Sequence, residues 1–126
     1  MAFKLKSKGE LFGHNEELSE FGRPVFEKKL DSGVIAEANR DGTTFVDARA
    51  SDKQKREAIS HENVHHDQML QGRLQYNNEE VIWKKDTKSP ARVYERVGGA
   101  LFSPAGKKLI EGDSSFEWEN EAYKKQ

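Results

Sequence analysis

The residues best suited to chemistry lie in the middle of the chain, at His61, Glu62 and His65. Side chains four positions apart on an α-helix are separated by roughly 40° around its axis, so the two imidazoles would share one face and could hold one metal ion. Glu62 would lie on the flank of that face, where a carboxylate can take a proton from a water bound to zinc. The spacing therefore predicts a zinc site with a general base, suited to the hydrolysis of a carbonyl compound.

The segment that carries these residues has the signals of one uninterrupted helix, predicted over 51–71. Ser51 is a favourable N-cap, and Gln54 three residues later completes a capping-box pattern. Neither Gly nor Pro interrupts the segment, and Gly72 is a natural stop at its end. A rigid helix of this kind is what the proposed histidine pair requires.

A zinc site with two histidines needs at least one further protein ligand. His66 would point about 100° away from its neighbour in the motif, and His14 lies far away in a polar segment. We therefore expect a carboxylate from a helix predicted over 116–125, where Glu119 and Glu121 are the candidates. Because these two residues are two positions apart, they would point roughly 200° apart, and only one can face the ion.

Two patterns carry a family resemblance: His61-Glu62-x-x-His65-x-x-Gln68 and Trp118-Glu119-x-Glu121-Ala122-Tyr123. Together they resemble the minimal gluzincin domains found in phage and bacterial genomes. The resemblance covers the central helix and the C-terminal segment, about a third of the chain. It implies a zincin-like metallopeptidase, in a protein that a phage could encode.

The same resemblance implies roles for single residues. In related gluzincins the third ligand is the Glu of an E-x-x-A pattern, which implies Glu119 here, although Tyr123 stands where those proteins have Asp or Asn. Thermolysin-like enzymes have Glu directly before Ala, which would imply Glu121 instead. Asp67 and Gln68 are candidates to orient the metal ligands, with hydration at the surface as the alternative.

Around the motif the sequence predicts an α+β fold of zincin-like type. In it, the HExxH helix packs on a short antiparallel sheet, and the C-terminal helix brings the third ligand. Segments 34–38 and 43–47 are predicted to form a hairpin, because β-branched and aromatic residues flank a turn that includes Gly42. Two further short strands are predicted over 80–84 and 91–94.

Composition sets limits on the kind of protein. The chain has 126 residues, of which 34% are charged and 34% hydrophobic, with a mean hydropathy of −0.94. We expect a polar N-terminal arm over 1–20 and a single metallopeptidase domain over 21–126. Because the apolar core must be thin, a bound zinc ion should contribute to folding as well as to chemistry.

Charge and hydropathy exclude several classes of partner. The 21 basic and 22 acidic residues nearly cancel, which argues against nucleic-acid binding. No apolar run approaches the length that spans a membrane, and the N-terminus has no continuous apolar segment of a signal peptide, so the expected location is the cytoplasm. The absence of cysteine excludes disulfides and thiol-based zinc sites.

The predicted function is zinc-dependent hydrolysis of a peptide or protein substrate, bound as an extended chain in a shallow cleft. Tyr76, Tyr94 and Tyr123 could each supply a hydroxyl that stabilises the oxyanion, and Tyr94 is favoured because it lies between the two ligand-bearing helices. The alternatives are a non-catalytic, zinc-containing phage structural or accessory protein and a protein-binding module. An intact Glu62 argues against a purely structural site, which needs no base.

Overall fold

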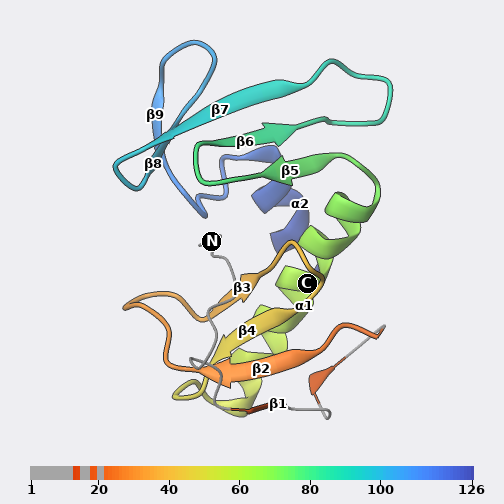
Figure 1. The fold of residues 1–126 in the computed structure, drawn as a ribbon, viewed down its shortest axis with the longest axis vertical. Coiled ribbons are helices and arrows are strands. Elements are labelled where there is room, and N and C mark those ends of the chain that lie inside the picture. The colour runs from red at the N-terminus through yellow and green to blue at the C-terminus, as the bar shows by residue number, and fades with distance from the viewer. Residues whose placement is uncertain (1–12, 15–17, 20–21) are drawn as a thin grey trace.

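The computed structural model describes residues 13–14, 18–19 and 22–126. Within that part of the chain, two helices and two β-sheets form the predicted α+β fold. Helix α1 (Asp52–Leu70) runs between the two sheets and contacts both, and helix α2 (Glu117–Lys125) lies against α1 (Figure 1). Most of the predicted 1–20 arm lies outside the described residues. Leu18, however, is buried, which differs from the prediction of a polar arm over these residues.

The first sheet contains the expected antiparallel pairing together with one parallel pair, so it is mixed. Its strand order is β1-β2-β4-β3. The strands are β1 (Gly13–His14), β2 (Val25–Lys28), β3 (Ala36–Ala38) and β4 (Thr44–Asp47). β3 and β4 form the predicted antiparallel hairpin, and Gly42 in its turn has a φ of 90°. β2 pairs with β4 in parallel, a contact between distant segments that no local pattern indicates.

The second sheet is an antiparallel meander in chain order. Its strands are β5 (Leu74–Tyr76), β6 (Glu80–Trp83), β7 (Arg92–Val97), β8 (Ala100–Phe102) and β9 (Lys108–Ile110). The two strands predicted in this region correspond to β6 and β7. β8 was missed because Gly98 and Gly99 suggested a break; both have positive φ, 58° and 80°, and form the tight turn that joins β7 to β8.

Helix α1 begins and ends as its sequence predicts. The Ser51 hydroxyl accepts a hydrogen bond from the Gln54 backbone N–H at 3.2 Å, and the Gln54 side chain accepts one from the Ser51 N–H at 3.0 Å. Gly72, just past the last turn, has a φ of 73°. These local interactions hold the helix in the register that determines where its histidines point.

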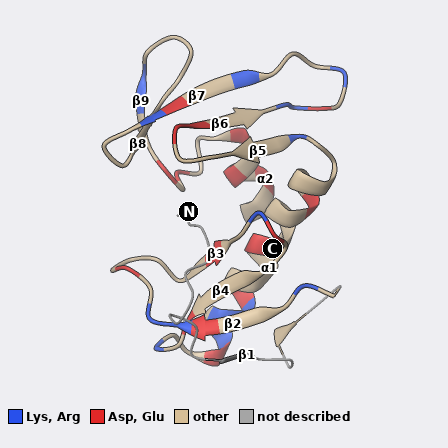
Figure 2. Ribbon diagram, viewed as in Figure 1, with Lys and Arg blue, Asp and Glu red and all other residues tan. Residues whose placement is uncertain are grey.

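Two hydrophobic clusters form the core. An aromatic cluster lies between the second sheet and α2 and contains Leu74, Tyr76, Val81, Trp83, Tyr94, Leu101, Phe116 and Trp118. A smaller aliphatic cluster lies between the first sheet and α1 and contains Leu18, Val25, Ala36, Val46 and Ile59. Basic and acidic residues are interspersed over both sheets (Figure 2), which agrees with the small net charge of −1. In the described part of the chain, neither helix is long and apolar enough to cross a membrane.

Candidate metal centre

The predicted ligands come together where α1 and α2 pack against each other. His61 and His65 are one turn apart on the buried face of α1, and Glu119 lies in the first half of α2. Ala122, one turn after Glu119, is completely buried, and its small side chain lets α2 approach α1 closely. All three ligand side chains are buried, and they form the group of potential metal ligands found among the described residues.

The distances in this group suit a single small cation. Nε2 of His61 and Nε2 of His65 lie 2.9 Å and 2.8 Å from the same Glu119 oxygen, Oε1, and 3.2 Å from each other. Zinc bonds of about 2.0–2.1 Å in a tetrahedral site place neighbouring ligand atoms about 3.3 Å apart. The three atoms would therefore need to separate by only a few tenths of an ångström to hold an ion between them.

The hydrogen bonds behind the histidines direct their lone pairs toward this point. Nδ1 of His65 lies 2.8 Å from Oε1 of Gln68, whose amide nitrogen donates to the Trp118 carbonyl at 3.1 Å. Because the Gln68 oxygen can only accept, Nδ1 of His65 carries a proton, and in the neutral ring Nε2 is then the nitrogen that can bind a metal. Nδ1 of His61 lies 2.8 Å from Oε1 of Gln126 in the same arrangement.

Atoms this close need a positive charge among them, either a metal ion or a proton that an imidazole shares with the Glu119 carboxylate. Glu119 contributes negative charge as well: burial raises the pKa of its carboxyl, but its contacts with His61 and His65 outweigh burial and bring the pKa down to about 2. Oε2 of Glu119 is buried and has no hydrogen-bond partner among the described residues. Two imidazoles and a carboxylate with these lone pairs fit zinc, which binds nitrogen and oxygen ligands.

Glu62 lies next to the ligands and is almost inaccessible, with 2% of its surface exposed. Burial raises the pKa of its carboxyl well above the usual value, and the negative charge of Glu119 raises it further. Oε2 of Glu62 is buried without a hydrogen-bond partner among the described residues. A carboxylate with high proton affinity and a free oxygen is suited to accept a proton from a reacting group.

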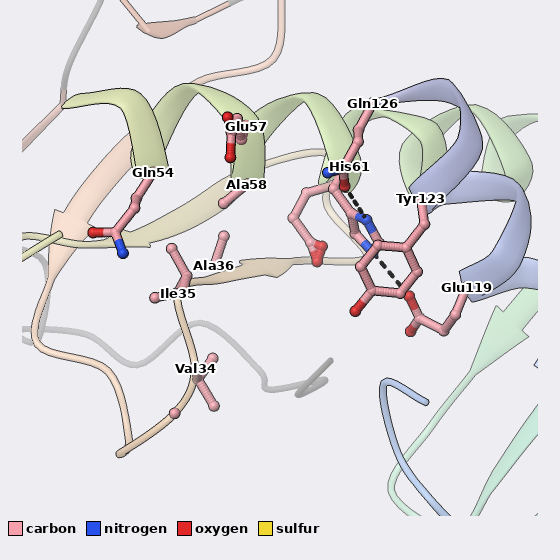
Figure 3. Close-up of a pocket in the computed structure, with 12 residues that line it drawn as sticks. Val34, Ile35, Ala36, Gln54, Glu57, Ala58, His61, Glu119, Tyr123 and Gln126 are labelled. Carbon is pink, nitrogen blue, oxygen red and sulfur yellow. Dashed lines mark hydrogen bonds and ion pairs between the residues drawn. The ribbon is translucent and has the colours of Figure 1, made fainter. Parts of the chain in front are cut away.

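A cavity of about 300 Å³ opens beside the ligands (Figure 3). One wall is the N-terminal half of α1, and the opposite wall is the segment that leads into β3, from Gly33 to Ala36. α2 closes one end with Glu119, Tyr123 and Gln126. Of the predicted site residues, this cavity is lined by His61, Glu62, Glu119 and Tyr123, whereas His65 lies behind them, completely buried.

The other ligand candidates lie elsewhere. Glu121 forms an ion pair with Arg73, whose two terminal nitrogens donate to its oxygens at 2.8 Å and 2.9 Å, so the alternative to Glu119 does not belong to the ligand group. His66 points away from the site, as predicted, and its Nε2 lies 2.9 Å from the Thr44 hydroxyl. His14 has its backbone in β1, and its side chain lies outside what the structure describes.

Of the two residues expected to orient the ligands, only Gln68 does so. It is completely buried, and it joins His65 to the residue that precedes Glu119. Asp67 instead accepts a hydrogen bond from Arg23 at 2.6 Å, on the exposed side of the helix. The difference follows from helix geometry, since Gln68 is three residues after His65 and lies on its face, whereas Asp67 does not.

Tyr94, the favoured source of a catalytic hydroxyl, is not at the site. Its ring packs in the aromatic cluster at 5.6 Å from Phe116 and 5.0 Å from Trp118, and it is not among the residues that line the cavity. Its place in the sequence between the two helices did not reveal that its side chain faces the core side of β7. Tyr76 is also buried, and its hydroxyl donates to the Ala38 carbonyl at 2.8 Å.

Tyr123 is the tyrosine that lies at the site. Its ring centre is 4.4 Å from that of His61, and it is half exposed on the cavity side of α2 (Figure 3). Burial raises the pKa of its hydroxyl, and Glu119 and Glu62 add to this, so the hydroxyl keeps its proton at neutral pH. One sequence signal could have found it, because Tyr123 follows Glu119 by four positions and so shares its helix face.

Comparisons of this chain with protein-family models, with curated proteins and with solved structures found no significant match.

Proposed function

We propose that this protein is a zinc-dependent peptidase of the gluzincin type. One observation carries the proposal: His61, His65 and Glu119 bring three potential ligand atoms together, and Glu62 lines the adjoining cavity with His61 and Glu119. A purely structural site needs only the ligands and is usually closed by a fourth one. Here the site adjoins a cavity and has a buried carboxylate that is not needed to hold the ion.

A zinc ion held by these residues would supply a Lewis acid that polarises a carbonyl and lowers the pKa of water. The carboxylate of Glu62 would take a proton from the attacking water and pass it to the nitrogen of the leaving amine. Its raised pKa favours holding the proton between these two steps. Gln68 and Gln126 would keep the two imidazoles in the tautomer that binds metal.

The strand beside the cavity favours a peptide as the substrate. β3 is the last strand in the order of its sheet, so one of its edges has no neighbouring strand among the described residues. The Ile35 carbonyl accepts from Asp47 at 2.8 Å, so Ile35 faces β4 and the backbone of the next residue, Ala36, faces the unpaired edge. Farther along this edge, the Ala38 carbonyl already accepts from the Tyr76 hydroxyl, so the part left for a peptide is around Ala36. Ala36 also lines the cavity. An extended peptide could pair with this edge and present a bond to Glu62.

The test compares three proteins after loading with zinc: wild type, Glu62→Gln and, as a control, Glu95→Gln. Glu95 is exposed on β7 in the other sheet, so its change from acid to amide is matched but distant. We expect all three to bind one zinc ion, and we expect Glu62→Gln alone to lower the hydrolysis of a fluorogenic peptide library by a factor of about 100 or more. Stoichiometric zinc without hydrolysis that depends on Glu62 would contradict the proposal and favour the non-catalytic alternative.

A further inference from the structure

We infer that the hydroxyl of Tyr123 donates a hydrogen bond to the oxyanion that forms on the substrate carbonyl. This inference depends on the proposed peptidase function and assigns one further catalytic residue to it. The geometry points to Tyr123 because, of the three tyrosines in the chain, it alone lines the cavity beside the ligands. Tyr76 and Tyr94 are buried in the aromatic cluster.

The position of Tyr123 follows from the helix that carries the third ligand. Glu119 and Tyr123 are one turn apart on α2, so both face α1 and the cavity. The Tyr123 ring lies across His61, with 4.4 Å between ring centres and 60° between planes. Figure 3 shows the ring beside the Glu119 carboxylate, at the end of the cavity where the ligands lie. A substrate carbonyl bound in this end of the cavity would therefore lie near this ring.

The hydroxyl of Tyr123 is available for a new hydrogen bond. Among the described residues, this hydroxyl makes one hydrogen bond, to the Gly112 carbonyl at 3.3 Å and in an exposed position. A bond of that length lies beyond the usual range for a hydroxyl donor, so little is lost when it is exchanged. By contrast, the Tyr76 hydroxyl makes a buried 2.8 Å bond to Ala38 and is committed to the fold. With 49% of its surface exposed, Tyr123 also has room to turn toward a substrate.

The chemical role is defined by where charge develops during hydrolysis. As the water oxygen bonds to the carbonyl carbon, the π electron pair moves onto the carbonyl oxygen, and Glu62 takes the proton of the water. The O–H of Tyr123 would donate to that oxygen while it is negatively charged. When the carbonyl re-forms, the C–N bond breaks, the nitrogen takes the proton from Glu62, and Tyr123 keeps its own proton throughout.

The same contacts would also fit a simpler role, in which the ring only covers His61. Two variants distinguish these roles. Tyr123→Phe keeps the ring and removes the hydroxyl, whereas Tyr123→Leu removes both. Tyr94→Phe is the matched control, because it removes a hydroxyl from a residue that the structure places in the core and away from the cavity.

The experiment measures zinc content, peptide hydrolysis and the affinity for a phosphinic peptide of alanine and leucine residues. The tetrahedral phosphinate of that probe resembles the oxyanion, so binding reports on the donor without any turnover. We expect Tyr123→Phe to retain zinc, to lower kcat by about 10- to 100-fold with KM nearly unchanged, and to bind the phosphinic peptide about tenfold more weakly. Tyr94→Phe should match the wild type in all three measurements.

Three results would overturn the inference, and they can be told apart. If Tyr123→Phe equals the wild type in kcat and in phosphinic peptide affinity, the hydroxyl has no role, and the peptidase proposal stands. If Tyr123→Leu loses zinc while Tyr123→Phe keeps wild-type kcat and affinity, the role of Tyr123 is to pack its ring against His61. If the zinc-loaded wild type neither hydrolyses peptides nor binds the phosphinic peptide, the proposed function fails, and the role of Tyr123 fails with it.

Discussion

The two halves of this molecule are built on different kinds of core. The half around the five-stranded sheet buries the aromatic cluster, with Trp83, Tyr94, Phe116 and Trp118 in mutual contact or nearby. The half around the four-stranded sheet buries the smaller aliphatic cluster together with Phe45 and Leu30, and it adds buried polar groups such as Lys28, Glu37 and Asp47. Because hydrophobic stabilisation follows the apolar area that is buried, the first half has more intrinsic support than the second.

The candidate metal centre joins these two unequal halves. Its histidines are on α1, whose earlier residue Ile59 belongs to the aliphatic cluster, and Glu119 follows Trp118 of the aromatic cluster. A bound ion would therefore connect the weaker half to the stronger one through α1 and α2. In this polar chain, the most hydrophobic part thus positions one residue of the candidate metal centre, and a well-capped helix positions the other two.

The largest expected effect comes from the aromatic half. Trp118→Ala should lower the free energy of unfolding by about 3–5 kcal/mol, because it removes a large, completely buried ring. Val46→Ala in the aliphatic cluster should lower the free energy of unfolding by roughly 2 kcal/mol, since it removes fewer buried carbon atoms than Trp118→Ala. Urea denaturation of the metal-free proteins measures both values. Equal losses would contradict the contrast between the two cores.

Removal of zinc tests the link between the halves. With free zinc at 100 times its dissociation constant, binding adds about 2.7 kcal/mol to the stability of the folded state. We therefore expect a strong chelator to lower the melting temperature of the zinc-loaded protein clearly. His65→Ala, which lacks one of the ligands, should melt at the same temperature with and without the chelator. A wild-type melting curve that stays unchanged after demonstrated loss of metal would show that the halves hold together without it.

The next effect concerns pH and the contact between α1 and β4. Burial lowers the pKa of His66 from its usual 6.5 to about 4, and the positive charge of Arg23 adds to this. Because the folded protein holds this imidazole neutral, the stability it contributes is complete above pH 6.5 and is lost as the pH falls toward 4. The loss should reach about 2–3 kcal/mol.

The metal-free wild type and His66→Gln, which can still contact the Thr44 hydroxyl, give the comparison. Their difference in unfolding free energy should change between pH 6.5 and 4, with the wild type losing more stability on acidification. A constant difference over this range would show that His66 is not held neutral by the fold.

The smallest expected effect sharpens the assignment of the third ligand. Glu121→Gln should leave zinc affinity nearly unchanged and lower stability by less than about 1 kcal/mol, because it weakens partly exposed ion pairs with Arg73 and Lys125. Glu119→Gln should weaken zinc affinity strongly, since it removes the negative charge between the histidines. Zinc titration of both variants measures the difference. If Glu121→Gln lost zinc strongly and Glu119→Gln did not, Glu121 rather than Glu119 would be the third ligand.

The part of the fold that the sequence predicted best is the part that local interactions determine. The Ser51 cap, the uninterrupted helix and the Gly72 stop are all present, and so is the hairpin that contains Gly42. The second sheet was predicted only in part. A Gly-Gly pair can end a strand or form a tight turn between two strands, and the sequence does not distinguish these roles for Gly98-Gly99. The parallel pairing of β2 with β4 joins distant segments and has no local signal.

The sequence by itself determined how His61, Glu62 and His65 are arranged relative to one another. The directions of side chains around a helix follow from their spacing, and the cap at Ser51 determines where this helix begins. It also narrowed the third ligand to two carboxylates on one helix. Only the tertiary structure decided that α2 turns Glu119 inward, and that Tyr123 rather than Tyr94 lies at the site. The physical reason is that these choices depend on which faces of separate elements are buried against each other. That burial is determined by the packing of both clusters together and by no single segment.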